Sequence, residues 1–342
     1  MTNNRNVTDV AIIGAGPVGL FAIFECGMLK MNCHVVDALE VVGGQCAALY
    51  PEKPIYDIPA HPSIDARDLI AKLRAQAAPF NPVYHLGQQV ATMREKDGKT
   101  LVLGTSKGAT IEARAVIVAA GVGAFGPNRP PLENIGAYED KGPGVGVHYM
   151  VTRRDDFAGK RVVIAGGGDS AVDWALSLSE IASSVAVVHR RPKFRAAPNS
   201  VAKMRNLAEA GKIEMAVPYQ LHALDGNGDL NAVVVKDLGG NEKRLEADAL
   251  LPFHGLSRNL GPIAEWGLNL SRNHVEVNPT TLASSVPGIH AIGDIATYDG
   301  KLKLILCGFS EAAMAAHAIH GRVHPGEALH FEYSTSKGVP AE

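Results

Sequence analysis

The sequence predicts an α/β protein with two Rossmann-like dinucleotide-binding domains. Residues 9–20 and residues 160–171 each combine an apolar run, a glycine-rich turn and a helix-like segment, which is the pattern that opens a βαβ dinucleotide unit. A length of 342 residues also exceeds one compact core and is typical of about two domains. The proline- and glycine-rich residues 125–131 indicate a domain boundary.

In the first unit, the apolar residues 10–13 run into Gly14, Gly16 and Gly19 at the G-x-G-x-x-G spacing. The first glycine makes a tight turn, the second lets the backbone approach a pyrophosphate, and the third lets helix and strand pack closely. The start of the following helix offers free N–H groups to phosphates. An ordinary glycine-rich turn is the alternative, but it requires neither the strand before nor the helix after.

A second short strand at residues 33–36 ends at Asp37, 21 residues after Gly16. At this place a carboxylate accepts hydrogen bonds from a ribose 2′-OH and repels a 2′-phosphate, so we expect FAD or NAD rather than NADP. Gln45 follows two glycines that permit close approach of a ligand. Tyr50 offers a flat face to a flavin ring. A surface turn and a packing tyrosine are the alternatives for these two residues.

The second unit repeats this spacing with Gly166, Gly168 and Ala171, and alanine is an accepted third residue. Asp169 and Ser170 stand at the predicted helix start. Two such units in one chain are difficult to explain by chance. We therefore expect a second nucleotide to bind here.

The residues 21 positions after the second glycine indicate which nucleotide the second unit binds. His189 stands 21 residues after Gly168 and is followed by Arg190 and Arg191. A cationic cluster at the place of the first unit's carboxylate can clamp a 2′-phosphate with charge-assisted hydrogen bonds. The second unit is therefore predicted to bind NADP(H), with a solvated basic turn as the alternative.

Composition excludes other classes of function. The formal net charge is −2, with 46% hydrophobic and 20% charged residues, so no global feature indicates nucleic acid or an anionic membrane as a partner. Residues 1–8 are polar, and no apolar run is long enough for a bilayer, so we expect a cytoplasmic protein. The four cysteines form no C-x-x-C pair and no zinc-like spacing, so we expect no metal site.

The two units, the His189 cluster and the segment Ala291-Ile-Gly-Asp294 resemble the two-dinucleotide flavoprotein reductases related to thioredoxin reductase. The match covers nearly the whole chain. This family implies three-layer ββα domains, with the NADPH domain inserted into the FAD domain. We expect residues 1–121 and 281–342 to bind FAD, with the C-terminal tail covering the flavin, and residues 122–280 to bind NADP(H).

The chain departs from thioredoxin reductase at the redox-active cysteines. Met150 and Arg153 stand where that family has its C-x-x-C pair, and a disulfide relay needs both sulfurs. Residues 43–53 and the tail with Tyr333 instead resemble the thioredoxin-reductase-like, type 2 ferredoxin–NADP reductases of bacteria.

This resemblance implies a homodimeric enzyme without a redox-active dithiol. Hydride would pass between NADPH and flavin N5, and single electrons would pass between the flavin and a ferredoxin or flavodoxin. One alternative is an NADPH-dependent flavoprotein reductase of another acceptor, such as a quinone or a low-molecular-weight disulfide. The other is a non-catalytic, NADPH-responsive flavoprotein.

The resemblance also assigns roles by position. Asp37 binds the adenosine ribose, Gln45 and Tyr50 contact the flavin, and Tyr333 covers its other face. The further expected FAD contacts are Pro17 at the pyrophosphate, Val90 at the adenine, Phe125 at the ring, Asp294 at the ribityl–pyrophosphate region and Thr335 from the tail.

Ferredoxins are usually acidic, so a local basic surface would steer them to the protein. Candidates for this surface are Lys193, Arg195, Lys301 and Lys303, with a solvated face as the alternative.

Overall fold

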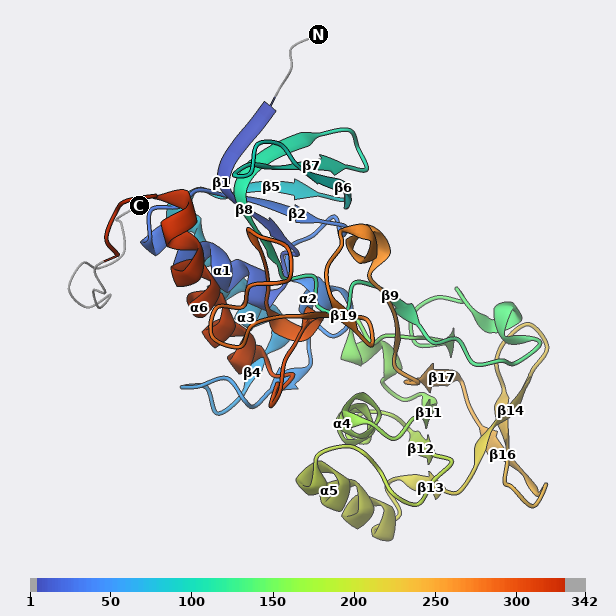
Figure 1. Ribbon diagram of the computed structural model, residues 1–342. Coiled ribbons are helices and arrows are strands. Elements are labelled where there is room, and N and C mark those ends of the chain that lie inside the picture. Colours follow the sequence, from blue (N-terminus) through green and yellow to red (C-terminus); the bar gives the residue numbers. More distant parts are fainter. Residues whose placement is uncertain (1–4, 330–342) are drawn as a thin grey trace. The chain divides into compact units, whose positions relative to one another are not determined.

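The structure is a computed structural model that describes residues 5–329, and their side chains except at residues 5, 124–127 and 256–258. The chain forms two compact units (Figure 1). The first contains Met1–Phe125 and Arg258–Glu342, and the second contains Gly126–Ser257. Strands β9 (Ala124–Pro127) and β18 (Leu256–Asn259), where the chain passes between the units, pair with each other.

A seven-stranded sheet organises the first unit, in the order β5-β2-β1-β8-β7-β6, with β21 also paired to β8. Its parallel strands are β5 (Val83–Leu86), β2 (Cys33–Asp37), β1 (Arg5–Ile13), β8 (Thr110–Val118) and β21 (Ile289–Ala291). Strands β6 (Val90–Glu95) and β7 (Leu101–Thr105) continue the sheet as an antiparallel meander. Apolar, β-branched residues dominate β1 and β8 because both faces of these strands are covered.

Helices α1 (Pro17–Met28), α3 (Ala66–Ala77) and α6 (Ile305–Val323) cover one face of this sheet and lie together in Figure 1. Ile12 and Ile117 point toward them and are fully buried. On the other face, side chains of β1, β8 and the meander form a second core together with residues from 260–275. Shorter elements complete the unit: α2 (Gly44–Ala48), β3 (Pro54–Ile55), β4 (Ile64–Asp65), η1 (Ala78–Phe80), η4 (Gly261–Glu265), β19 (Leu270–Ser271), β20 (His274–Glu276), η5 (Gly293–Ile295) and β22 (Ala296–Thr297).

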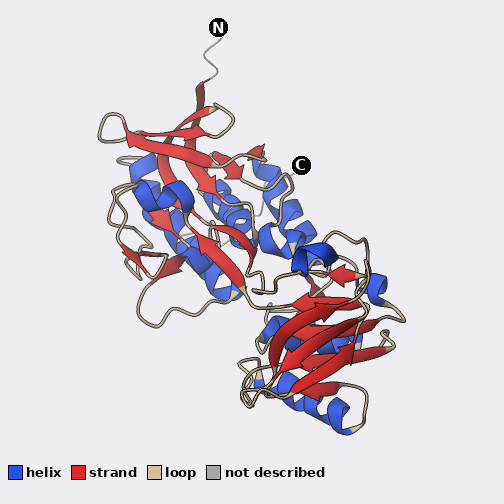
Figure 2. Ribbon diagram, turned by 90° about the vertical axis from the view of Figure 1, so that its right-hand side faces the viewer, coloured by secondary structure: helices blue, strands red, loops and turns tan. Residues whose placement is uncertain are grey.

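The second unit has a parallel sheet in the order β10-β17-β11-β12-β13. The strands are β10 (Gly146–Val147), β17 (Ala249–Pro252), β11 (Arg161–Ala165), β12 (Ser184–Val188) and β13 (Glu214–Ala216). Helix α4 (Asp169–Leu178) packs on β11 and β12 and contacts α5 (Pro198–Glu209). Figure 2 shows the strands and helices of this unit in separate layers.

An antiparallel sheet forms the third layer of this unit. It consists of β14 (Gln220–Asp225), β15 (Ala232–Lys236) and β16 (Glu242–Glu246), and its Val233 and Val235 pack against Val163 and Leu250 of the parallel sheet. The short helices η2 (Ile135–Tyr138) and η3 (Arg154–Phe157) precede β11. The predicted fold class, two three-layer ββα domains with one inserted into the other, is confirmed.

The observed second boundary differs from the predicted one. The inserted domain was expected to span residues 122–280, whereas residues 258–280 belong to the first unit. The reason is burial: Leu260, Ile263, Trp266, Leu268 and Val275 are part of the core that covers the sheet of the first unit. Which cofactor each unit binds stays a prediction.

Within residues 5–329, no helix combines the length and the apolar character needed to cross a membrane. The same residues contain no cluster of three or more His, Cys, Asp or Glu side chains that could hold a metal ion. All four cysteines are free thiols.

His290 on β21 predicts a pH dependence of stability. It is only 6% exposed, and burial, followed by the charge of Arg322, lowers its pKa from 6.5 to about 4. Between these pH values the unfolded chain binds a proton that the folded chain does not bind. The stability linked to this histidine is therefore complete above pH 6.5 and is lost as the pH falls toward about 4.

Urea unfolding at several pH values checks this expectation. His290→Gln should lose less unfolding free energy between pH 6.5 and 4 than the wild type. His222→Gln, which alters an exposed side chain of the second unit, serves as the control and should behave like the wild type. Equal losses in all three proteins would contradict the assignment.

Candidate functional site

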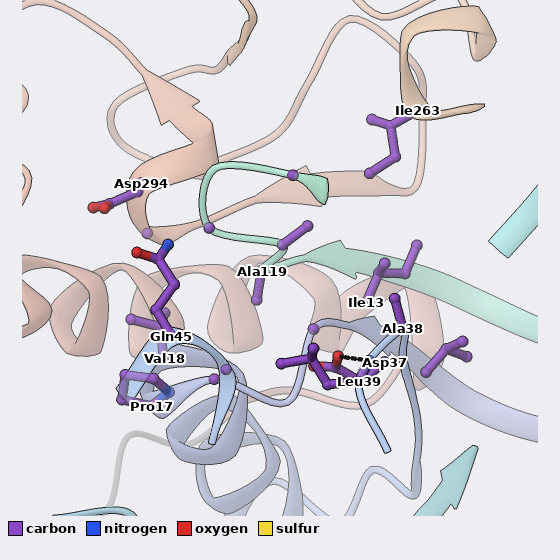
Figure 3. A pocket seen from close by; sticks show the side chains of 18 of the residues that line it. Ile13, Pro17, Val18, Asp37, Ala38, Leu39, Gln45, Ala119, Ile263 and Asp294 are labelled. Atoms are coloured by element: carbon purple, nitrogen blue, oxygen red, sulfur yellow. Dashed lines mark hydrogen bonds between the residues drawn. The ribbon is translucent and has the colours of Figure 1, made fainter. Parts of the chain in front are cut away.

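A cavity of about 440 Å³ lies in the first unit where the parallel strands end. Ligand pockets typically have this size, and open α/β sheets bind their ligands at the carboxyl ends of the strands. Three residues that line the cavity directly follow a strand, namely Gly14 after β1, Ala38 after β2 and Ala119 after β8, and Gly293 lies two residues after the end of β21. In Figure 3, Asp37 and Leu39 lie on one side of Ala119, and Gln45, Pro17 and Asp294 lie on the other.

Most of the predicted FAD residues line this cavity: Gly14, Gly16, Pro17, Asp37, Gln45, Tyr50, Val90 and Asp294. Gly19 does not line it and instead packs inside the turn. The side chain of Phe125, in β9, and the whole of Tyr333 and Thr335 lie outside the described part of the chain.

The three glycines of the first unit have different reasons to be glycine. Gly14 has φ +108°, and a Cβ there would lie 2.4 Å from the carbonyl oxygen of Ala119. A Cβ at Gly19 would lie 2.0 Å from the carbonyl oxygen of Gly14. At Gly16, by contrast, the nearest atom to a Cβ is 3.9 Å away, on Gly44. The protein's own packing requires the first and third glycines, whereas a Cβ at the second would make only an ordinary van der Waals contact.

Asp37 is held beside this turn by two backbone donors. The N–H of Ala15 donates to its Oδ2 at 2.6 Å, and the N–H of Leu39 donates to its Oδ1 at 2.8 Å. Burial raises the pKa of the carboxyl, and the two hydrogen bonds oppose that shift. The carboxylate therefore has a fixed position at one end of the cavity, where it can accept hydrogen bonds from hydroxyl groups of a ligand.

Tyr50 and Cys46 form a neutral pair in the cavity wall. Burial raises the pKa of Cys46 to about 11 and also raises that of Tyr50, and the two side chains are hydrogen-bonded. The Nζ atom of Lys53 lies 5.7 Å from the centre of the tyrosine ring. At neutral pH the thiol is protonated, so it lacks the thiolate that disulfide chemistry needs.

The second unit repeats the arrangement of glycines. A Cβ at Gly166 would lie 2.7 Å from the carbonyl oxygen of Phe253 and 2.9 Å from the Cβ of Ala171. A Cβ at Gly168 would meet nothing within 4 Å. Here the second glycine faces open space, as a turn that admits a pyrophosphate requires.

The cationic cluster is fixed to this turn. The ring of His189 lies against Gly167, where a Cβ would be 2.2 Å from its Cε1. The N–H of Arg195 donates to the carbonyl oxygen of Gly167 at 2.7 Å, and the N–H of Ala197 donates to Oδ1 of Asp169 at 2.9 Å. Burial lowers the pKa of His189; a hydrogen bond with the backbone of Lys193 opposes this shift, and the charges of the neighbouring arginines add to it.

Several side chains beside the glycine turn of the second unit are accessible to a ligand. Ser170, Arg190, Arg191 and Arg195 are exposed. Arg195 is a candidate for the basic docking surface, and that stays a prediction; its backbone bond to Gly167 also puts it next to the His189 cluster. Its position in the same short loop as His189 is the signal in the sequence for this second role.

Comparisons with known proteins agree with this geometry. The family model described as pyridine nucleotide-disulphide oxidoreductase matches residues 8–318. A ferredoxin--NADP reductase of Paramagnetospirillum magneticum is 64% identical over 337 residues, covering 98% of this chain and 99% of that protein. Another, from Gluconobacter oxydans, is 63% identical over 334 residues, with 97% of each covered. The chain belongs to the ferredoxin–NADP reductase family.

Solved structures relate this reductase to thioredoxin reductases by fold. The enzyme of T. acidophilum matches with a TM-score of 0.80 at 25% identity, covering 93% of this chain and 99% of that one. The Lactococcus lactis enzyme matches with a TM-score of 0.78 at 21% identity, covering 92% and 99%. The resemblance to thioredoxin-reductase-like ferredoxin–NADP reductases is thereby confirmed.

One surface expectation for the reductase is wrong. Lys301 was a candidate for a basic docking surface, but its side chain is 4% exposed and pairs with Glu311. Lys303 is exposed, lines the cavity and contacts His274. Lys193 is also exposed.

Several cavity residues of the reductase were missed by the sequence analysis. They include Cys46 within α2, residues 88 and 89 just before β6, residues 260–263 just after β18, and residues 303–305 at the start of α6. Cys46, next to Gln45, and Gln89, next to Val90, had a local signal in the sequence. Residues 260–263 and 303–305 reach the cavity through tertiary packing.

A Cβ at Gly16 or at Gly168 would collide with no protein atom, so alanine at these positions should affect ligand binding more than stability. Gly16→Ala and Gly168→Ala should each change the unfolding free energy of the ligand-free chain by no more than about 1 kcal/mol. Each should weaken dinucleotide binding at its own unit by about tenfold or more, because the methyl group occupies the phosphate approach.

Calorimetric titration and urea unfolding measure the two effects. Gly19→Ala is the contrasting variant, because its methyl group collides with the backbone of Gly14 and should lower the unfolding free energy itself. Unchanged ligand affinity in Gly16→Ala and Gly168→Ala would show that no ligand approaches the backbone at these two positions.

Proposed function

We propose that this protein binds FAD in its first unit and NADP(H) in its second, and that it exchanges electrons between NADPH and a ferredoxin or flavodoxin. The observation that carries the proposal is the pair of matched glycine turns, with a carboxylate beside the first and a cationic cluster beside the second. The full-length similarity to ferredoxin--NADP reductases supports the choice of electron carrier.

The cavity of the first unit fits FAD. Gly16 leaves room for a pyrophosphate, and Asp37 is fixed where it would accept hydrogen bonds from the adenosine ribose. Gln45, Tyr50 and Asp294 would hold the flavin side. When bound, the flavin supplies the conversion between a two-electron hydride and single electrons. Val90 would contact the adenine, and Pro17 would contact the pyrophosphate. Phe125 and Thr335 would contact the flavin.

The second unit fits NADP(H) rather than NAD(H). Gly166, Gly168 and Ala171 form the turn, with Asp169 and Ser170 at the start of α4. Arg190, Arg191 and Arg195 present cations beside this turn, where a 2′-phosphate would attract them. The ring of His189 packs on Phe194, with 4.8 Å between centroids, and keeps the loop in place.

The residues present favour a carrier that needs no thiol relay. Met150 and Arg153 replace the cysteine pair, and the thiol of Cys46 is protonated at neutral pH. Electrons would leave directly for a small carrier, and the exposed Lys303 at the cavity is a candidate contact for an acidic one. We further propose a cytoplasmic homodimer in which the tail with Tyr333 covers the flavin.

Stopped-flow spectroscopy of the purified protein tests this function. We expect a yellow protein whose flavin absorbance is bleached rapidly by NADPH and much more slowly by NADH. Mixing the reduced protein with ferredoxin or flavodoxin should restore the absorbance faster than a quinone or a low-molecular-weight disulfide does. A faster reaction with either of the last two would favour the other acceptor, and no bleaching would favour a non-catalytic protein.

Replacing the arginines tests the NADP assignment separately. The double substitution Arg190→Ala and Arg191→Ala should raise KM for NADPH by about 100-fold or more, because it removes two charge-assisted hydrogen bonds and each contributes about 1.5–3 kcal/mol. KM for NADH should change little, since NADH has no 2′-phosphate. Arg205→Ala, at an exposed site on α5, is the matched control. Equal effects on both nucleotides would contradict the assignment.

A further inference from the structure

A buried ion pair lies behind the wall of the FAD cavity. The side chains of Lys301 and Glu311 are 4% and 3% exposed and contact each other directly. Glu311 is in the second turn of α6, and Lys301 is in the loop that leads into this helix. Neither residue lines the cavity itself.

Glu311 ties together several points of the preceding loop. Its Oε2 accepts a hydrogen bond from the backbone N–H of Gly293 at 2.7 Å. Its Oε1 accepts one from the hydroxyl of Tyr298 at 2.7 Å and another from Nζ of Lys301. The Lys301 cation also lies 5.6 Å from the centre of the Tyr298 ring. One carboxylate therefore fixes three positions in residues 293–301.

The first of these positions is part of the cavity wall. Gly293 and Asp294 line the cavity, and Gly293 has φ +73°. A Cβ at Gly293 would lie 3.5 Å from the side chain of Val18, and a Cβ at Gly308 on α6 would lie 2.3 Å from it. Val18 is in the first turn of α1, directly after the glycine turn. Glu311 thus holds Gly293 against the start of the helix that follows the glycine turn.

Lys301 balances the charge of Glu311. A buried carboxylate is costly unless it is paired and hydrogen-bonded. Lys301 neutralises Glu311, and Tyr298 and Gly293 supply the remaining donors. The arrangement brings an acceptor to the Gly293 N–H without leaving an uncompensated charge near the cofactor.

We propose that Glu311 is a positioning residue for the flavin cofactor: its carboxylate, neutralised by Lys301, holds the backbone of Gly293 so that Asp294 faces the cavity in the geometry that FAD binding requires. This inference rests on the proposed binding of FAD in the first unit. It assigns a role in cofactor binding to two residues that do not touch the cavity.

Two double variants of the full-length chain isolate the hydrogen bond to Gly293. Lys301→Met with Glu311→Gln removes both charges but keeps an oxygen acceptor for the N–H. Lys301→Met with Glu311→Leu removes both charges and the acceptor. Both variants avoid an unpaired buried charge, which could prevent Glu311→Ala alone from folding. Glu25→Gln is the control, because Glu25 is a partly buried carboxyl on α1 that faces His317 of α6 rather than the loop.

The measurements are the FAD dissociation constant, from flavin fluorescence, and the thermal unfolding midpoint with and without FAD. We expect the leucine variant to bind FAD about tenfold or more weakly than the glutamine variant and to gain less in midpoint on adding FAD. The glutamine variant and Glu25→Gln should stay within about threefold of the wild type.

Equal FAD affinity in the two double variants would overturn the inference, even if both unfold at lower temperature, because Glu311 would then be only structural. Equally weakened binding in both would also overturn it, since the Gly293 bond would not be the cause. Failure of the wild type to bind FAD at all is a distinct result that refutes the proposed function.

Discussion

The close approach of the backbone at the ends of β1 and β8 is the constraint on which the first unit depends. The turn at Gly14 passes so close to the carbonyl oxygen of Ala119 that no Cβ fits between them. This contact brings the ends of neighbouring parallel strands together and lets α1 start directly above them. The second unit meets the same constraint between Gly166 and Phe253. Both units therefore open at the same place, where a dinucleotide can reach the start of a helix.

The two glycine turns have the same residue spacing, but the charges beside them are opposite. In the first unit, Asp37 is fixed by the N–H groups of Ala15 and Leu39. In the second, the loop carrying Arg190 and Arg191 is held through Arg195 and Gly167. In each case a backbone group of the glycine turn is hydrogen-bonded to the charged segment. The turn that would bind the phosphates therefore also positions the charges that would contact the 2′ group of the same nucleotide.

Sequence patterns predicted the parts of the site that depend on local spacing. The glycines, Asp37 and the His189 cluster follow their strands at fixed distances, because a strand, a turn and a helix define the geometry within one βαβ unit. Residues 260–263 escaped prediction because the chain returns to the first unit only after 132 residues of the second, Gly126–Ser257. Lys301 was misjudged because a lysine is usually exposed, and its burial depends on Glu311, ten positions later.

The path of the chain has a consequence for synthesis on the ribosome. The second unit is one continuous stretch, so all of its strands have been made once residue 257 has emerged. The sheet of the first unit still lacks β21 at that stage, and its helical layer lacks α6. Because domains generally fold as units during synthesis, the inserted unit can complete its fold while the first is still unfinished. The cavity proposed to bind FAD gains its last wall from residues 303–305, which are made only after the whole inserted unit.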